Sequence, residues 1–402
     1  MTKFLTFFIF LITIFSCSHT PSKNMSVTPS SIEEHDGIKF KCSSEQLIKI
    51  DQELLQYFNS LQINENWYNH KINRNELYFT LNTEKEDTNT LDLINRSQFK
   101  IREEVVELIK ANKKDKTKAK SVLTVSKKEI AMALMQHGRT TEFSGANCST
   151  EALIDHIGIR QNIAAWTEKV SWRWPDGSAA AWNKKYWKRG SPTTATPVHV
   201  IINDMFINED KYSIGCYTAT KMVVIQGVLD YYFRIKQDLS MVRKLEKILL
   251  SDNEPLVGIE PGIMWSFEKD FDLAETNKEG KLLDIQHEIS PKNVIPGEWI
   301  YLLNTDSKSH EVTGYEGSNA ISLGRNKLDD YYNDHNHSYT FEEKLDEVWQ
   351  WRNEVFSRSR HASRIRPLTH DEILELYKSP QEGGLLFDYR VIPKIFTGLN
   401  KK

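Results

Sequence analysis

A cysteine at the start of a predicted helix is the residue with the clearest capacity for covalent chemistry. Cys216 opens a strongly apolar run within residues 212–225, Tyr-Ser-Ile-Gly-Cys-Tyr-Thr-Ala-Thr-Lys-Met-Val-Val-Ile. The partial positive charge at a helix N-terminus stabilises a thiolate, which is the nucleophilic form of cysteine. The pattern therefore predicts that Cys216 acts as a nucleophile and forms a covalent intermediate.

Apolar residues at helical spacing predict the elements that must position this cysteine. The predicted helices cover residues 44–61, 99–111, 127–136, 149–169, the run from Cys216, 239–250 and 341–356. Two strands are predicted at 297–304 and 319–323, and Gly324-Arg325-Asn326 is predicted as the turn after the second strand. Because helices come first and strands follow the cysteine helix, we expect an α+β fold with the sheet packed on that helix.

The first 17 residues have the features of an export signal. Lys3 supplies a positive charge, and residues 4–15 form an almost wholly apolar run that is too short to span a membrane. The run ends in Ile-Phe-Ser-Cys, which matches a bacterial lipobox in which Cys17 is acylated. Ser18 stands where an aspartate would signal inner-membrane retention, so we expect a lipoprotein of the cell envelope, in the outer membrane of a Gram-negative cell. An ordinary secretory signal with an incidental cysteine is the alternative.

Composition limits the classes of protein that need consideration. A net charge of −3 over 402 residues gives no indication of nucleic-acid binding, and the length predicts one large or two medium domains. After Cys17 the chain holds Cys42, Cys148 and Cys216, too few for a disulfide scaffold. If Cys216 is a free thiol, Cys42–Cys148 is the only bridge that these three residues can form.

Four tryptophans gather between residues 170 and 190, around a Pro-Asp-Gly turn. They are Trp172, Trp174, Trp182 and Trp187. Such a group can line a sugar-binding cleft or form a packed aromatic subcore, and we favour the subcore.

Three segments together resemble the bacterial spore-coat type of protein-glutamine gamma-glutamyltransferase, within the papain-like NlpC/P60 superfamily. The run from Cys216 to Asp230 is similar to the nucleophile helix of that family without a gap. Residues 297–304 resemble its Gly-Asp-apolar-Tyr-Phe-x-Asn strand, and residues 315–324 resemble its Trp-x-Gly-Glu-Asn-Val-Ile-x-Leu-Gly strand. Lys344 and Leu345 fall in its next helix, so the resemblance extends over about residues 185–355.

The resemblance implies both a fold and a reaction. The fold would be a papain-like, NlpC/P60-like core in which the nucleophile helix packs on a small antiparallel sheet. The thiolate of Cys216 would attack a glutamine carboxamide and release ammonia, and a lysine amine would then convert the thioester into an isopeptide bond. No cofactor or metal would be needed, and the partners would be proteins that bear the glutamine and the lysine.

Several positions depart from the family pattern. The catalytic glutamate of the family falls on Ser318, and the glutamate that precedes its cysteine falls on Gly215. A histidine on the strand after the turn falls on Tyr331, with His335 and His337 shortly beyond. Since a serine is not a strong general base at neutral pH, the resemblance leaves the cysteine without a carboxylate partner.

Glu316 and His335 are the preferred candidates for the missing base. Glu316 would share a strand face with Ser318, because side chains alternate along a strand. His335 belongs to a polar Asp-His-Asn-His segment that could reach back, and His310 and Glu311 precede the strand. These loop histidines could equally be exposed residues without a role. The candidate catalytic residues are Cys216, Glu316, His335 and Ser318.

Cys148 is a rival nucleophile because it also stands at a predicted helix start. Residues 148–160 faintly resemble the cysteine helix of the animal-like transglutaminase core, but the region that should supply a His-Ala-Trp strand, 170–177, has no histidine. A buried structural cysteine is the alternative. His335 and His337 could form a weak metal site, but no cluster of cysteine or carboxylate ligands supports one, so we expect no metal.

The sequence therefore predicts a lipid-anchored thiol acyltransferase that joins protein glutamine to lysine or another primary amine. A cell-wall cysteine amidase or peptidase of NlpC/P60 type, acting on peptidoglycan peptides, remains open, as does a catalytically inactive binding module on the same fold. The predicted organisation is a lipoprotein signal peptide 1–17, a flexible tether 18–40, a helical N-terminal region 41–125, a papain-like transglutaminase-type domain 126–365 and a C-terminal extension 366–402.

Overall fold

A computed structural model describes much of the chain. Contacts divide the chain into Met1–Glu34 and His35–Lys402, and all described residues belong to the second unit. The described residues are 36–83, 99–109, 120–175, 180–188, 191–250, 284–286, 293–304, 306–312, 314–332, 338–356, 366–376 and 386–391. The predicted signal peptide, the acylation of Cys17, and His335 and His337 lie outside these ranges.

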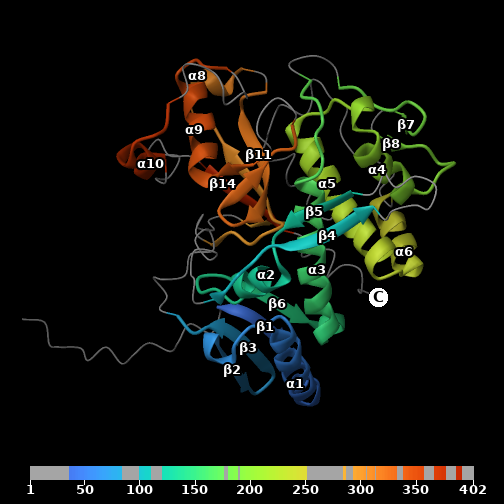
Figure 1. Ribbon diagram of the computed structural model, residues 1–402, viewed down its shortest axis with the longest axis vertical. Coiled ribbons are helices and arrows are strands. Elements are labelled where there is room, and N and C mark those ends of the chain that lie inside the picture. Colours follow the sequence, from blue (N-terminus) through green and yellow to red (C-terminus); the bar gives the residue numbers. More distant parts are fainter. Residues whose placement is uncertain are drawn as a thin grey trace, which may run out of the picture. The chain divides into compact units, whose positions relative to one another are not determined.

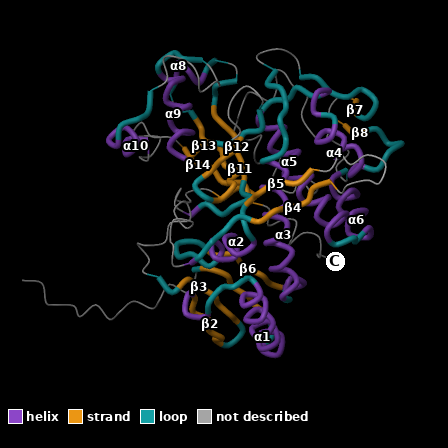
Figure 2. Tube along the Cα trace, viewed as in Figure 1, coloured by secondary structure: helices purple, strands orange, loops and turns teal. Residues whose placement is uncertain are grey.

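Helices and strands are interspersed along the described unit (Figure 1, Figure 2). The helices are α1 (Ser44–Ser60), α2 (Lys127–Leu134), α3 (Thr150–Thr167), α4 (Val198–Ile207), α5 (Cys216–Asp230), α6 (Leu239–Leu249), α8 (Ser307–His310), α9 (Phe341–Arg352) and α10 (His370–Leu376), and a π-helix (Tyr231–Ile235) follows α5. The strands are β1 (Gly37–Lys41), β2 (Tyr68–Asn73), β3 (Glu76–Leu81), β4 (Glu104–Ile109), β5 (Lys120–Thr124), β6 (Thr140–Ser144), β7 (Trp187–Lys188), β8 (Ser191–Pro192), β9 (Asp284–Gln286), β10 (Trp299–Leu303), β11 (Gly317–Gly324), β12 (Lys327–Asp329), β13 (Tyr339–Thr340) and β14 (Leu386–Val391). No helix among the described residues is both long and apolar enough to cross a membrane.

An antiparallel sheet with the strand order β13-β12-β11-β10-β14-β9 lies between two helical layers. Trp299 and Ile321, which pair across β10 and β11, belong to the apolar core that contains α3 and α5. Ile300 and Ala320 are one residue further along and belong to the core of α9. Because side chains alternate across a strand, α5 covers one face of this sheet and α9 covers the other (Figure 1).

A second sheet, with the order β2-β3-β1-β6, lies beside α1. Strand β1 pairs in parallel with β6 and antiparallel with β3, and so joins the N-terminal elements to the segment after α2. Helix α1 begins with a capping box. The Ser43 side chain accepts the backbone N–H of Gln46, and the Gln46 side chain accepts the backbone N–H of Ser43. Two further strand pairs, β4-β5 and β7-β8, complete the described strands.

Helix α5 is a central element of the core, because every one of its residues is buried. It packs against α3, and a glycine on each of the two helices allows close approach. A Cβ added at Gly227 of α5 would come within 2.3 Å of Ile163 in α3, and a Cβ added at Gly158 of α3 would come within 2.4 Å of the Tyr231 side chain, just after α5. The spacing of the two helices therefore leaves no room for a side chain at Gly227.

Most of the predicted elements are confirmed, and the fold is mixed α+β. The confirmed helices are α1, α2, α3, α5, α6 and α9, and the confirmed strands are β10 and β11. The turn at Gly324-Arg325-Asn326 is confirmed by positive φ angles at all three residues, 71°, 55° and 54°.

Three predictions for the N-terminal part are wrong. Residues 99–111 hold strand β4 and not a helix, because β-branched Val105 and Val106 pair with Leu123 and Val122 of β5 in a hairpin. The region 41–125 is consequently mixed and not helical, since it contains β2 to β5 as well as α1. The tether does not extend to residue 40, because β1 already begins at Gly37.

The four tryptophans of the aromatic segment all lie in its described residues, and each packs against other side chains. Trp172 is fully buried and donates its indole N–H to the Met205 carbonyl at 3.0 Å. The rings of Trp182 and Trp187 lie 4.8 Å apart, and Trp174 lies edge-on against Tyr332 at 5.1 Å. These contacts favour the interpretation as an aromatic subcore.

A buried ion cluster holds the start of β10 against α3. Arg139 donates to both carboxylate oxygens of Glu298, at 2.7 and 2.6 Å, and Arg160 donates to one of them at 3.3 Å. Burial acts to raise the pKa of Glu298, but the two guanidinium charges outweigh it and hold that pKa below its usual value. Gly297 has a φ of +81°, and a Cβ there would lie 2.7 Å from the Arg160 carbonyl oxygen. A glycine before Glu298 therefore lets the start of β10 pack closely against α3.

Glu129 gives the fold a testable dependence on pH. It is 1% exposed, and burial raises its pKa to about 7, although the backbone N–H of Arg325 donates to it. The folded state therefore keeps a proton that the unfolded chain releases, so stability falls as the pH rises from the unfolded pKa of 4.5 towards 7. We expect Glu129→Gln, which removes the ionisation, to stabilise the protein at pH 8 by about 3 kcal/mol relative to its effect at pH 4.

Thermal or denaturant unfolding of both proteins at the two pH values measures this difference. Glu311→Gln, at an exposed glutamate, is the matched control and should show no such dependence. An equal effect of Glu129→Gln at pH 4 and pH 8 would contradict the prediction.

Candidate active site

Cys216 is the first residue of α5, and its thiol is free. Gly215 is the N-cap residue and has extended backbone angles, φ −72° and ψ 162°, so the helix begins at the cysteine as predicted. Only 3% of the residue is exposed. The sulfur therefore lies at a buried helix N-terminus, beside the partial positive charge of the backbone N–H groups of the first turn.

Asn319 of β11 supplies a hydrogen bond to this sulfur. Its amide nitrogen Nδ2 lies 3.2 Å from Cys216 Sγ, and its Oδ1 accepts the indole N–H of Trp299 at 2.7 Å. An indole N–H can only donate, so the amide oxygen must face Trp299 and the amide N–H₂ must face the sulfur. Asn319 and Trp299 are fully buried, and their arrangement presents an oriented donor to the thiol or thiolate.

Tyr331 lies on the same side of the sheet and adds a second polar group. Its hydroxyl donates to Thr220 Oγ1 at 2.9 Å, and Thr220 in turn donates to the Cys216 carbonyl at 2.7 Å. Burial raises the pKa of Tyr331 well above its ordinary value, and the charges of Asp329 and Asp330 add to the rise. The phenol is therefore protonated at neutral pH, where it can donate a proton in a hydrogen bond but cannot act as a base.

Two other predicted site residues, Glu316 and Ser318, take no part in the hydrogen bonding of the Cys216 sulfur. The carboxylate of Glu316 accepts the backbone N–H of Gly314 at 3.1 and 3.0 Å. Ser318 is fully buried and lies, by strand alternation from Asn319, on the face of β11 that packs against α9. Neither is bonded to Cys216 in the described part of the chain, and His335 lies outside it.

The sequence did not identify Asn319, although a signal was present. A buried asparagine inside an apolar strand needs hydrogen-bond partners, and Asn319 directly precedes the apolar residues Ala320 and Ile321. The choice between Ser318 and Asn319 depends on which face of β11 meets α5. That choice is a property of packing, and strand alternation alone allows either residue.

The rival nucleophile is excluded by a disulfide. Cys148 is bonded to Cys42, which confirms the only bridge that the sequence allowed with a free Cys216. The bridge ties the end of β1 to the start of α3 across 106 residues of sequence. Cys148 is therefore a structural cysteine and not a catalytic thiol.

The arrangement suits nucleophilic attack by sulfur on a carbonyl carbon. A helix N-terminus and an oriented amide N–H₂ both stabilise negative charge on the nucleophile. Among the described residues, no three His, Cys, Asp or Glu side chains gather as ligands for a metal ion.

Comparison with known proteins adds a family to this geometry. A sequence model of the family described as protein-glutamine gamma-glutamyltransferase matches residues 105–364, which is more than half of the 402 residues. The match begins before β5 and ends after α9, so it includes every residue of the site described above.

Other comparisons add little. No curated protein matches the chain. Among solved structures, a transglutaminase from Geobacillus stearothermophilus, without its C-terminal extension, is 16% identical to this chain. The similarity covers 61% of this chain and 94% of that one, with a TM-score of 0.36, which is too low to support a conclusion.

Proposed function

We propose that Cys216 carries the acyl group in the reaction of this protein. The premise is that the chain belongs to the protein-glutamine gamma-glutamyltransferase family and is a transglutaminase-like enzyme. The enzyme would join a glutamine of one protein to a lysine, or another primary amine, through a Cys216 thioester. The observation that carries the proposal is the free thiol at the N-terminus of α5, bonded to Asn319 at 3.2 Å.

The reaction proceeds in two acyl transfers. The thiol gives its proton to the general base, the thiolate attacks the carboxamide carbon, and the C–N bond breaks. The leaving nitrogen takes that proton from the base and departs as ammonia. The lysine amine then attacks the thioester carbon, loses a proton, and displaces the thiolate to give an isopeptide bond. The α5 N-terminus and Asn319 stabilise the thiolate at the beginning and the end of this cycle.

The identity of the general base is a separate part of the proposal. Tyr331 is protonated, and Glu316 is bonded to the Gly314 backbone, so neither of them is the immediate acceptor of the thiol proton in this arrangement. His335 stays the predicted base. The papain-like, NlpC/P60-type description of the core is also part of the proposal, and the packing of α5 on an antiparallel sheet supports it.

We further propose that the enzyme is exported and anchored by a lipid on Cys17, in the cell envelope. The lipobox-like Ile-Phe-Ser-Cys sequence supports this location. The Cys42–Cys148 disulfide also supports it, because disulfides persist in oxidising compartments outside the cytosol. Strand β14 (Leu386–Val391) pairs with β10, so the predicted boundary at residue 365 would separate two neighbouring strands of one sheet. The proposed catalytic domain therefore includes β14, together with the segment from 126 to 365.

The test is incorporation of a fluorescent primary amine into a glutamine-bearing protein by the purified enzyme. We expect time-dependent labelling that stops after alkylation of Cys216 with iodoacetamide and that releases ammonia in equal amount. A parallel incubation with peptidoglycan fragments tests the amidase alternative. Release of soluble muropeptides without amine incorporation would identify the protein as a cell-wall amidase and reject the proposal. Absence of both activities would indicate a catalytically inactive binding module.

A further inference from the structure

Tyr331 has a backbone conformation that bulky residues seldom adopt. Its φ is +75°, in the left-handed region that favours glycine, and its side chain is fully buried. A conformation of this kind is energetically costly and persists only where the surrounding structure holds it. Because residues strained in this way cluster at functional sites, Tyr331 is a candidate for a role in the reaction.

Hydrogen bonds on both sides of the residue hold this backbone in place. The backbone N–H of Tyr331 donates to Asp329 Oδ1 at 2.7 Å, and its carbonyl accepts the backbone N–H of Trp172 at 2.9 Å. The carboxylate of Asp330, the residue between, accepts the ammonium group of Lys344 at 2.7 Å, and both residues are fully buried. The main chain therefore fixes the direction in which the phenol points.

The phenol lies beside Asn319, on the face of the sheet that α5 covers. Ile321 of β11 pairs with Asp329 of β12, and the same antiparallel register, continued by two residues, places the tyrosine opposite the asparagine. Opposite residues lie about 5 Å apart and on one face of a sheet. Tyr331 accordingly belongs to the apolar core that contains α5. Since Asn319 donates to Cys216 Sγ, the thiol and the phenol lie in the same part of the site.

The hydroxyl of Tyr331 points at the first turn of α5. The Thr220 hydroxyl donates its one proton to the Cys216 carbonyl at 2.7 Å, so in its 2.9 Å bond to Tyr331 it can only accept. Thr220 follows Cys216 by four residues and therefore lies on the same helix face. The phenol thus presents a proton on the side of α5 that holds the thiol.

Acyl transfer at Cys216 needs a donor for the substrate oxygen as well as for the sulfur. When the thiolate adds to the carboxamide carbon, the carbonyl oxygen gains negative charge, and donors aimed at that oxygen lower the barrier. The amide of Asn319 faces the sulfur. Burial holds the pKa of Tyr331 well above its ordinary value, so the phenol keeps its proton and can donate it in a hydrogen bond. A phenolic hydrogen can turn from Thr220 to a new acceptor without movement of the ring.

We propose that Tyr331 is a catalytic residue whose hydroxyl donates a hydrogen bond to the oxygen of the tetrahedral intermediate. The inference rests on the proposed function, since it assigns a role in the acyl transfer at Cys216. No bond within the tyrosine forms or breaks. Its hydrogen bond passes from Thr220 to the substrate oxygen while that oxygen is negatively charged, and it returns when the carbonyl forms again. The strained backbone serves the reaction because it holds the ring beside the cysteine helix.

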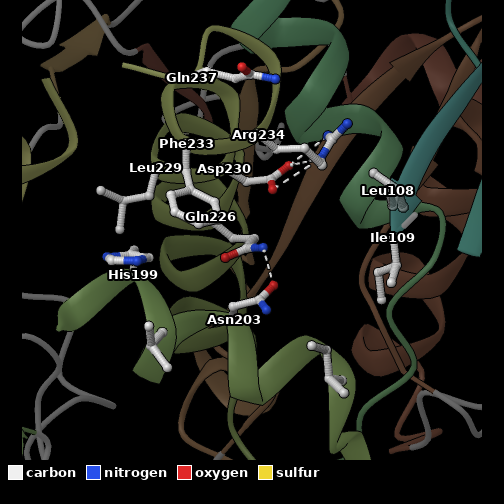
Figure 3. Close-up of a pocket in the computed structure, with 12 residues that line it drawn as sticks. Leu108, Ile109, His199, Asn203, Gln226, Leu229, Asp230, Phe233, Arg234 and Gln237 are labelled. Carbon is white, nitrogen blue, oxygen red and sulfur yellow. Dashed lines mark hydrogen bonds and ion pairs between the residues drawn. The ribbon is translucent and has the colours of Figure 1, made fainter. Parts of the chain in front are cut away.

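The other end of α5 supplies a control. A hollow of about 480 Å³ lies there, lined by residues of α4, β4 and the C-terminal half of α5, and Cys216 does not line it (Figure 3). Tyr231 directly follows α5, is 4% exposed and donates through its hydroxyl to Asp155 at 2.8 Å. Tyr231→Phe therefore removes a buried phenolic hydroxyl, as Tyr331→Phe does, but about 20 Å along the helix from the thiol.

Two small reagents that react with the same thiol separate a catalytic role from a structural one. The ester p-nitrophenyl acetate acylates Cys216 through a tetrahedral intermediate and releases p-nitrophenol. Iodoacetamide alkylates the sulfur by direct displacement and forms no such intermediate. Both rates are measured on the full chain carrying Cys17→Ser, and the rate of the same chain with Cys216→Ala is subtracted. Neither reagent requires a glutamine-bearing protein or an amine.

We expect Tyr331→Phe to slow acylation by at least about tenfold and to lower kcat for amine incorporation by about a hundredfold, with KM and the alkylation rate unchanged. Tyr231→Phe should leave all four quantities unchanged. Thr220→Val, which removes only the resting acceptor, should slow acylation less than Tyr331→Phe. An unaltered acylation rate in Tyr331→Phe, an equal slowing of acylation and alkylation, or an equal loss in Thr220→Val would overturn the inference.

The same measurements distinguish this inference from the proposed function. A wild type that is acylated by the ester but incorporates no amine would reject the proposed function, and the acylation rate of Tyr331→Phe would still decide the inference. A wild type that iodoacetamide alkylates but p-nitrophenyl acetate does not acylate would overturn the inference, whatever the result with amines.

Discussion

Cys216→Ala is expected to lower amine incorporation by at least about a thousandfold, because no other free thiol occurs among the described residues. The substitution removes the atom that becomes the thioester and leaves the amide of Asn319 facing a small gap. Since the residue is buried at the start of α5, the thermal unfolding midpoint of the variant must be measured alongside its activity. Activity is measured as fluorescent amine incorporated per minute into a glutamine-bearing protein.

Cys216→Ser and the disulfide cysteines provide the controls. The serine variant keeps the size of the side chain and should be nearly as inactive, because a hydroxyl at this position lacks the acidity of a thiol. A variant with Ser at both Cys42 and Cys148 should lose stability but retain the rate per folded molecule. Retention of more than about 1% of activity by Cys216→Ala would place the nucleophile elsewhere.

Asn319→Asp is expected to lower amine incorporation by about a hundredfold to a thousandfold, with little change in the volume of the side chain. The retained carboxylate oxygen still accepts the Trp299 indole N–H, which lies 2.7 Å from Oδ1 in the native protein. The other oxygen replaces the N–H₂ group that faces Cys216 Sγ, so a donor becomes an acceptor with negative charge. Alkylation by iodoacetamide should be slower at neutral pH, and its pH profile should shift to higher pH.

This experiment is made in a Cys17→Ser background, so that Cys216 alone reacts. Trp299→Phe keeps an aromatic ring but removes the N–H that orients the amide, and it should shift the alkylation profile in the same direction by a smaller amount. Asn59→Asp, at an exposed position near the end of α1, is the control for added charge and should leave the profile unchanged. An unaltered profile in Asn319→Asp would reject the role of this amide.

Much of the secondary structure was predictable because it rests on local patterns. Helix α1 combines apolar periodicity with a start signal, the Ser43 capping box, whereas α3 and α5 are long, largely buried segments. The segment 99–111 was misassigned because a short apolar run does not distinguish a helix from a strand. Its partner strand, β5, decided the matter through cross-strand pairing at Val105 and Val106.

By itself, the sequence predicted Cys216 as the nucleophile and, with Cys216 free, left a single possible disulfide. Cys216 is marked by its place at the beginning of an apolar helix, and Cys42 and Cys148 are the remaining pair in the chain after Cys17. Both conclusions depend on local sequence and on counting, so they need no knowledge of packing.

Only the tertiary structure decided what faces the sulfur. Adjacent residues of β11 point to opposite faces of the sheet, so Ser318 and Asn319 are equally placed by the sequence. The packing of α5 against the face that holds Trp299 and Ile321 brought Asn319 to Cys216 and turned Ser318 towards α9. Which face of a strand a side chain occupies follows from alternation, but which helix covers that face depends on tertiary packing. For this reason the sequence alone did not identify Asn319 as the partner of the thiol.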